Sequence, residues 1–151
     1  MPQSLSNVIV HLVFSTKDRR PFLDQRDIRD EMHSVLGGTS KTLGCHPLIA
    51  GGVADHIHLL ANQSKTISLS DWVKELKRVT SIWIKEKGPR YNDFFWQAGY
   101  GAFSVSYSMV DKVTDYIRRQ EEHHQEQDFQ TEFRKLLERH CIEYDEKYVW
   151  D

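Results

Sequence analysis

The segment Val8-Ile9-Val10-His11-Leu12-Val13-Phe14, residues 8–14, is a continuous run of β-branched, aliphatic and aromatic side chains. It is short enough to be a buried strand, and the polar residues 15–18 end it. Beyond it, four apolar residues recur at helical spacing: Ile28, Met32, Val35 and Leu36. We expect a helix there, with Asp24 as its N-cap and Gly37-Gly38 just past its end.

Two further apolar stretches, residues 47–53 and 56–61, are separated by only two residues. This spacing is typical of a β-hairpin, and it places His56 and His58 on the second strand. Because side chains two residues apart on a strand share a face, both imidazoles are expected to point the same way.

The next segments predict a second helix and then a bent strand. The helix runs from Ser68 to Gly88-Pro89, with Asp71 in a capping position. Its apolar stripe consists of Leu69, Trp72, Val73, Leu76, Val79 and Trp83. Residues 94–97 and 99–106 are interpreted as one bent strand, whose glycines mark a turn or a close backbone approach.

Two more apolar stripes at helical spacing predict the last helices: Val110, Val113 and Ile117 after the cap Ser108, then Phe129, Phe133, Leu136 and Leu137. A tail over residues 142–150 follows. The order βαββαβα fits an α+β, ferredoxin-like sandwich, in which an antiparallel βαββαβ sheet carries helices on one face and C-terminal helices are added.

Composition limits the possible classes of protein. A chain of 151 residues has the size of one domain, so we expect a single domain over residues 1–151. With 20 basic and 22 acidic side chains the net charge is −2, so nucleic-acid binding would have to come from local basic patches. No apolar stretch approaches the roughly 20 residues that span a bilayer, and the start lacks signal-peptide features, so we expect a cytoplasmic protein. Residues 37–42 lack the spacing of a phosphate-binding loop, so no nucleotide cofactor is expected.

The candidate chemistry comes from the histidine pair and from a tyrosine. Tyr116 and Gln120 are four residues apart, which places them on one side of a helix. Two imidazoles, from His56 and His58, and one amide oxygen can hold a divalent ion and leave positions open for phosphate oxygens. The tyrosine hydroxyl would then be the nucleophile toward a phosphodiester. Taken singly, each residue is more often a packed or surface side chain than a functional one.

Local basic patches are the candidate DNA contacts. They comprise Arg19, Arg20, Lys74, Lys77 and Arg78, although such charges are also usual on solvated helix faces. His123 and His124 are adjacent, and adjacent helix residues point about 100° apart, so we expect both to be solvated rather than to be ligands.

Four ordered segments resemble the small single-strand transposases of the insertion-sequence 200/605 family, which belong to the HUH superfamily and use one catalytic tyrosine. The segments are residues 11–17, 55–60, 96–106 and 116–124, and together they extend over nearly the whole chain. Many members are expected to have Asn where this chain has Arg119.

The resemblance implies specific roles for four residues. His56 and His58 would be metal ligands for Mg²⁺ or Mn²⁺, Gln120 the third ligand, and Tyr116 the nucleophile that forms a 5′-phosphotyrosine. It also implies a homodimer, in which the tyrosine helix of one subunit could complete the site of the other, and recognition of hairpins in single-stranded DNA at the ends of a mobile element.

Three other functions compete with transposition. A domesticated relative could process repeated genomic hairpins with the same chemistry. A non-catalytic module could bind single-stranded nucleic acid on its sheet face, but this needs exposed aromatic residues on the central strands, where the sequence offers mostly aliphatic ones. A metal-dependent hydrolase would need carboxylates near the histidines, and only Asp55 is adjacent, pointing to the opposite face of a regular strand.

Overall fold

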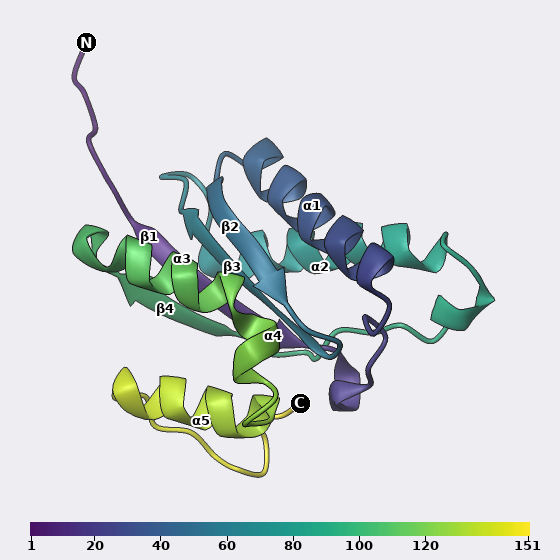
Figure 1. Ribbon diagram of the computed structural model, residues 1–151. Coiled ribbons are helices and arrows are strands. Elements are labelled where there is room, and N and C mark those ends of the chain that lie inside the picture. Colours follow the sequence, from purple (N-terminus) through teal and green to yellow (C-terminus); the bar gives the residue numbers. More distant parts are fainter.

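The computed structural model describes residues 1–151, and its sheet has the predicted ferredoxin-like order. The strands are β1 (Ile9–Ser15), β2 (His46–Gly52), β3 (His56–Asn62) and β4 (Gly101–Val105). The helices are α1 (Arg26–Thr42), α2 (Leu69–Lys85), α3 (Val110–Arg118), α4 (Gln120–His123) and α5 (Phe129–Arg139), with 3₁₀ turns η1 (Lys17–Arg19), η2 (Pro89–Tyr91) and η3 (Tyr107–Met109). All neighbouring strands are antiparallel in the order β2-β3-β1-β4, which confirms the predicted α+β fold (Figure 1).

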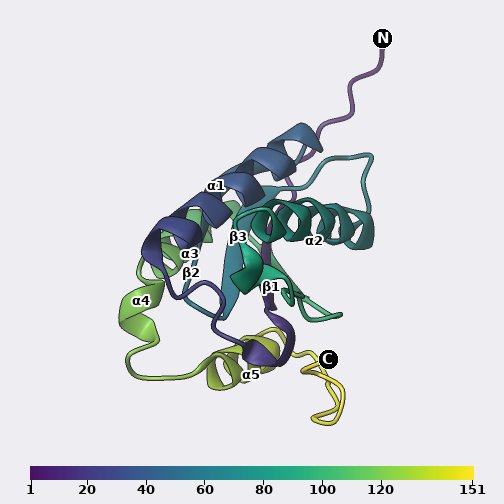
Figure 2. The same cartoon turned by 90° about the vertical axis from the view of Figure 1, so that its right-hand side faces the viewer.

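Both faces of the sheet are covered, which explains why β1 and β3 are almost uninterrupted apolar runs. Alternate side chains of β1, such as Leu12 and Phe14, join the main core with α1 and α2. The intervening ones face the other way, where Val13 packs with α5 and Ile9 packs with Ile117 of α3. Helices α1 and α2 thus lie on one face as predicted, and the C-terminal helices cover the other (Figure 2).

Helix α1 does not end at Gly37-Gly38, which lie inside it, so that prediction was wrong. The N-cap is Gln25 rather than Asp24. The residue that ends the helix is Gly44, which follows the C-cap and has a φ of +80°, the left-handed conformation that glycine adopts without strain. Two interior glycines are tolerated because Met32, Leu36 and Ser40 bury this helix against the core.

Helix α2 begins as predicted. Ser68 is its N-cap, and the Ser68 side chain accepts a hydrogen bond from the backbone N–H of Asp71. This contact satisfies one of the amide groups left unpaired in a first helical turn.

The third predicted helix is broken in two. Helix α3 ends at Arg118 and α4 begins at Gln120, with Arg119 at φ −101° and ψ 26° between them. No Gly or Pro marks this break. Tertiary contacts account for it instead, because the Gln120 side chain is buried and hydrogen-bonded to partners on two other elements. None of the helices is long and apolar enough to span a membrane.

Candidate functional site

The two histidines of β3 lie at the centre of the molecule on the face covered by the C-terminal helices. His56 and His58 point to the same face, as predicted, and both are fully buried. Strand β3 pairs with β1 on one side and β2 on the other, so the histidine backbone is held in ladders on both edges. The imidazoles therefore stand on a rigid element.

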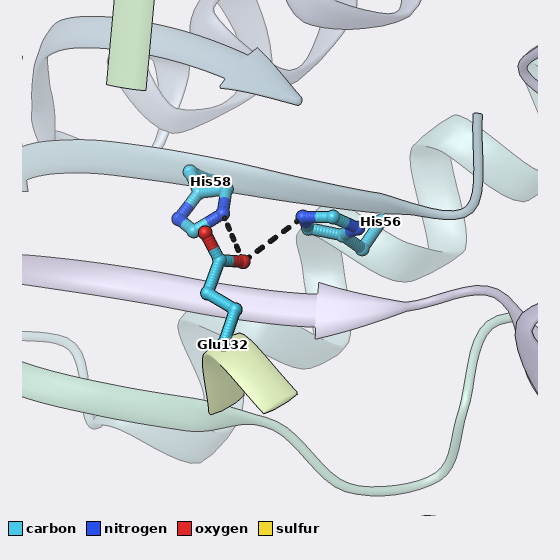
Figure 3. Close-up of side chains that lie close together, drawn as sticks. All are labelled: His56, His58 and Glu132. Carbon is cyan, nitrogen blue, oxygen red and sulfur yellow. Dashed lines mark hydrogen bonds and ion pairs between the residues drawn. The ribbon is translucent and has the colours of Figure 1, made fainter. Parts of the chain in front are cut away.

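A carboxylate that the sequence analysis missed joins them. The Oε1 atom of Glu132, on α5, lies 3.1 Å from His58 Nε2 and 3.2 Å from His56 Nε2 (Figure 3). Glu132 is buried, although it is acidic, and it shares the inward side of α5 with Phe129, Phe133 and Leu136. An acidic residue within an apolar helical stripe was the available signal, because such residues are seldom buried unpaired.

Tyr116 and Gln120 reach the same carboxylate from α3 and α4. Gln120 Oε1 lies 3.2 Å from His56 Nε2, and Gln120 Nε2 donates to Glu132 Oε2 at 3.1 Å. The Tyr116 hydroxyl donates to Glu132 Oε2 as well. The structure thus brings together within one chain the four residues expected from the sequence, with Glu132 between them.

Each ligand-type histidine has a second partner on its other ring nitrogen. Asp55 Oδ1 lies 2.7 Å from His56 Nδ1, and His11 Nε2 lies 2.7 Å from His58 Nδ1. The expectation that Asp55 points away was wrong, because the regular strand begins only at His56 and Asp55 lies in the preceding bend. Partners of this kind orient histidines in metal sites.

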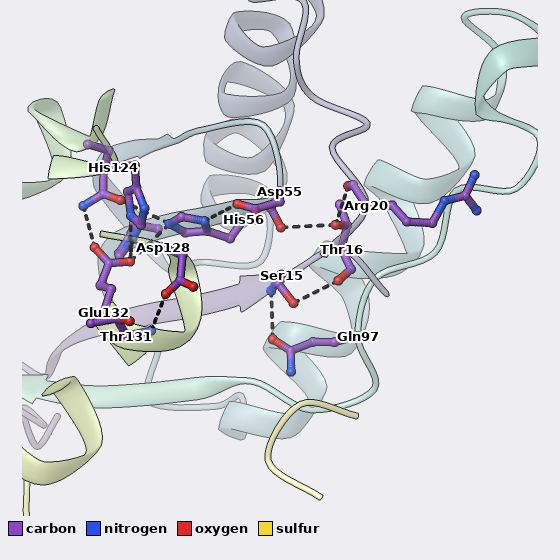
Figure 4. A network of polar contacts seen from close by, with 12 residues as sticks. Ser15, Thr16, Arg20, Asp55, His56, Gln97, His124, Asp128, Thr131 and Glu132 are labelled. Carbon is purple, nitrogen blue, oxygen red and sulfur yellow. Dashed lines mark hydrogen bonds and ion pairs between the residues drawn. The ribbon is translucent and has the colours of Figure 1, made fainter. Parts of the chain in front are cut away.

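The expectation that His123 and His124 are solvated was also wrong. His124 Nε2 lies 3.2 Å from Glu132 Oε1, and its ring packs on His56 with centroids 4.5 Å apart. The His123 ring stacks on Tyr116 at 4.7 Å. The chain changes direction at Arg119, between α3 and α4, and this brings both rings to the site. Figure 4 shows the polar contacts that link His124, Glu132, His56 and Asp55.

The charges in this cluster depend on one another. Burial alone would raise the pKa of Glu132, but His58, His124 and His56 outweigh it and hold that pKa well below its ordinary value. Burial would lower the pKa of His56, yet hydrogen bonds to Asp55 and Glu132 raise it to about 9. Burial lowers the pKa of His58. These shifts favour an ionised Glu132 beside a protonated His56.

The hydroxyl group of Tyr116 stays protonated in this environment. Burial raises its pKa, and the negative charge of Glu132 raises it further. The tyrosine is half-buried and therefore remains accessible from one side.

The predicted DNA-contact residues are largely engaged elsewhere. The Lys77 ammonium donates to the backbone carbonyls of residues 97, 98 and 99, at 2.7, 3.2 and 2.8 Å. Arg78 pairs with Glu75 at 2.7 Å. The guanidinium groups of Arg19 and Arg20 lie over the rings of Trp150 and Phe22, and Lys74 makes no ion pair. None of these five residues lies in the histidine cluster.

Two solved structures share this fold. A putative transposase from Deinococcus radiodurans R1 matches with a TM-score of 0.62 and 22% identity, over 80% of this chain and 95% of that one. A REP-associated tyrosine transposase bound to a REP hairpin matches with a TM-score of 0.60 and 11% identity, over 82% of this chain and 72% of that one. The fold is therefore one that small transposases adopt.

Sequence comparison identifies the family. The chain is 31% identical over 120 residues to the transposase for insertion sequence element IS200 of Salmonella typhimurium strain LT2, covering 76% of this chain and 77% of that protein, and equally to the transposase of Salmonella typhi. The family model described as "Transposase IS200 like" matches residues 4–120. The chain belongs to the IS200-like transposase family. It is thus a DNA-binding enzyme of transposition, a class that cleaves and transfers DNA strands.

Proposed function

We propose that this transposase cleaves and rejoins single-stranded DNA through Tyr116. The observation that carries the proposal is the convergence of the Tyr116 hydroxyl and both β3 histidines on one carboxylate, Glu132. In the reaction, the tyrosine oxygen forms a bond to phosphorus and the bond to the 3′ oxygen breaks. The hydroxyl proton is released, the leaving oxygen takes up a proton, and a 5′-phosphotyrosine and a 3′-hydroxyl result. Because the phosphodiester energy is conserved, reversal rejoins strands without ATP.

The cluster fits a divalent cation. His56, His58 and Glu132 each offer one ligand atom, and these atoms lie within 4.8 Å of one another. Gln120 Oε1 is a fourth donor, 3.2 Å from His56 Nε2. The carboxylate and amide oxygens suit Mg²⁺ and Mn²⁺, and the imidazole nitrogens are common ligands of transition-metal ions. When bound, the ion would polarise the phosphodiester as a Lewis acid.

The protein's own side chains supply position. Glu132 and His123 hold Tyr116, the first through the hydroxyl and the second through its stacked ring. The Tyr116 ring lies beside the histidines, with its centroid 5.9 Å from that of His58. Holding the hydroxyl in line with the phosphorus lowers the barrier that a weak nucleophile must cross.

Single-stranded hairpins at the ends of a mobile element are the proposed substrates, and a homodimer is the proposed assembly. The REP-associated transposase of the same fold is bound to a REP hairpin, which supports a hairpin partner. A domesticated role on repeated hairpins uses the same site, so flanking DNA distinguishes the two: a mobile copy lies between paired element ends. Light scattering of the purified protein tests the dimer.

The test is a search for the covalent intermediate. The protein is mixed with single-stranded oligonucleotides from its own flanking DNA and Mn²⁺, then resolved on a denaturing gel. We expect a heat- and detergent-stable adduct that is absent in Tyr116→Phe and in His56→Ala. Tyr107→Phe is the matched control, because Tyr107 is 78% exposed and outside the cluster. An adduct that persists in Tyr116→Phe would overturn the proposal, as would binding without any adduct on every flanking strand.

A further inference from the structure

A cavity of about 550 Å³ opens beside the tyrosine, between β4, α3 and α5. His11, Tyr116 and Glu132 belong to its lining, so it adjoins the histidine cluster directly. In Figure 1, β4 and α3 lie on the left of the molecule and α5 lies below them. Its volume is within the range of about 300–1,000 Å³ typical of ligand sites, and therefore exceeds what a bound ion alone requires.

The lining of this cavity is positively charged, although the whole protein is not. Lys112, Lys135 and Arg139 line it, and Glu132 is the one acidic residue among the lining residues. Glu132 is already engaged by the histidines, by Gln120 and by Tyr116. Because the whole chain has a net charge of −2, the positive charge at this cavity comes from a local cluster of basic side chains.

The three cations are also free to bind an anion. None of them forms an ion pair with an acidic side chain, and the one polar contact among them is a hydrogen bond from Lys135 to Gln127 at 2.9 Å. This differs from Lys77 and Arg78 on the other candidate patch, whose charged groups are occupied by carbonyls and by Glu75. The remaining walls mix apolar and hydroxyl-bearing side chains, among them Val113 and Ser104.

We propose that this cavity binds the segment of single-stranded DNA that carries the scissile phosphate, with Lys112, Lys135 and Arg139 contacting its phosphates. Cations that contact the backbone and rings on which bases can stack are the usual components of a single-strand site, and Tyr116 and His140 supply rings in this lining. The inference rests on the proposed function, because it assigns the substrate path to Tyr116. It places the principal DNA contacts on α3 and α5, whereas the sequence analysis expected them near η1 and on α2.

The test measures DNA binding in a protein that lacks the Tyr116 hydroxyl and therefore cannot form the covalent adduct. Fluorescence anisotropy of a labelled single-stranded oligonucleotide from the flanking DNA is measured at several salt concentrations, in a Tyr116→Phe background. The test variant adds Lys112→Gln, Lys135→Gln and Arg139→Gln. The control adds Lys41→Gln, Lys65→Gln and Lys85→Gln, which remove the same charge from α1, the β3–α2 connection and α2. A third protein, with Lys112→Arg, Lys135→Arg and Arg139→Lys, keeps the charge.

We expect the test variant to lose at least tenfold in affinity, and its slope of log affinity against log salt to fall by about 2, since each single-strand phosphate contact contributes about 0.7. The control and the charge-preserving protein should stay close to the parent. Equal losses in the test and control variants would overturn the cavity assignment. A thermal unfolding temperature close to that of the parent would show that the test variant is folded, so that a loss of affinity reflects lost DNA contacts.

The two proposals fail differently. If native protein forms the Tyr116 adduct but the test variant binds as the control does, the tyrosine chemistry stands and the cavity assignment is wrong. If the test variant loses binding but no adduct forms with native protein, the cavity is a binding site and the tyrosine chemistry is wrong.

Discussion

His11 Nε2 and His58 Nδ1 are 2.7 Å apart, both within the buried face of the central strands β1 and β3. Burial lowers the pKa of both rings, so both are neutral and one donates its N–H to the other. Either ring can be the donor. His58 can therefore present Nε2 with a hydrogen, toward Glu132, or without one, as a metal ligand requires.

From this contact we expect His11→Phe to weaken Mn²⁺ binding by about 10- to 100-fold, the usual effect of losing a partner that orients a ligand histidine. Titration calorimetry measures the dissociation constant. His11→Gln, which keeps an acceptor, should retain part of the affinity, and His46→Phe, at an exposed position, should retain all of it. An unchanged Mn²⁺ dissociation constant in His11→Phe would show that the His11–His58 hydrogen bond does not contribute to metal binding.

Glu132→Gln should destabilise the metal-free protein by about 3 kcal/mol, because it removes the charge that compensates a buried, protonated His56. Urea unfolding measures this loss. Glu138→Gln, exposed on the same helix, should change the free energy of unfolding by less than about 0.5 kcal/mol. Equal effects of the two substitutions would contradict a central role for the carboxylate.

Two glycine substitutions should act in opposite directions. A Cβ at Gly51 would lie 2.8 Å from Ile117 Cγ2 and 2.9 Å from the Ile117 carbonyl oxygen, so α3 must move away from β2. We expect Gly51→Ala to cost about 1–3 kcal/mol and to reduce adduct formation, because Tyr116 is adjacent to Ile117. Gly38→Ala, with nothing within 4 Å inside α1, should instead stabilise by about 1 kcal/mol. Thermal and urea unfolding measure both, and a stabilised Gly51→Ala would disprove the close approach.

His33 on α1 should make the protein sensitive to mild acid. Its Nε2 is buried without a hydrogen-bond partner, and burial lowers the pKa to about 4. His33 takes up a proton near pH 6.5 in the unfolded chain but only near pH 4 in the folded protein. The free energy of unfolding is therefore highest above pH 6.5 and decreases as the pH falls from 6.5 toward 4. Between pH 7 and pH 5 the loss should be about 2 kcal/mol. Urea unfolding of His33→Gln at pH 7 and pH 5 should show a decrease in the free energy of unfolding that is smaller by this amount than in the parent protein. An identical pH dependence in the two proteins would refute the assignment.

Lys77→Met should destabilise the protein by about 2 kcal/mol, because the ammonium donates to three backbone carbonyls that would lose their partner. Lys74→Met, on an exposed and unpaired neighbour, should have a small effect. Urea unfolding compares the two. If both are neutral in stability while Lys77→Met weakens DNA binding, the original interpretation of Lys77 as a phosphate contact is the better one.

Much of the architecture followed from local pattern. The runs at residues 8–14 and 56–61 predicted β1 and β3, and helical stripes predicted the helices that cover them. The errors were at boundaries and in the bent strand expected over residues 94–97 and 99–106, of which only Gly101–Val105 forms β4, while Trp96 contributes an isolated bridge to Thr16. Gly37-Gly38 is a strong local stop signal, yet burial of the surrounding α1 residues outweighs it, whereas the break at Arg119 has no local signal at all.

Local patterns in the sequence were sufficient to predict the order of the elements and the shared face of His56 and His58, because both depend on the period of a strand or a helix. Tyr116 and Gln120 were expected on one helix, but the break at Arg119 puts them on two, and their contacts with Glu132 bring them together. Three features depend on packing in three dimensions: Glu132 enters the cluster, His11 and Asp55 hold the histidines, and the Lys77 ammonium is already hydrogen-bonded. Apart from Asp55, which is adjacent to His56 in the chain, the partners come from elements distant in sequence, such as β1 with β3 and β3 with α5. Their partners are chosen by packing and by the need to compensate buried charge, neither of which has a sequence period.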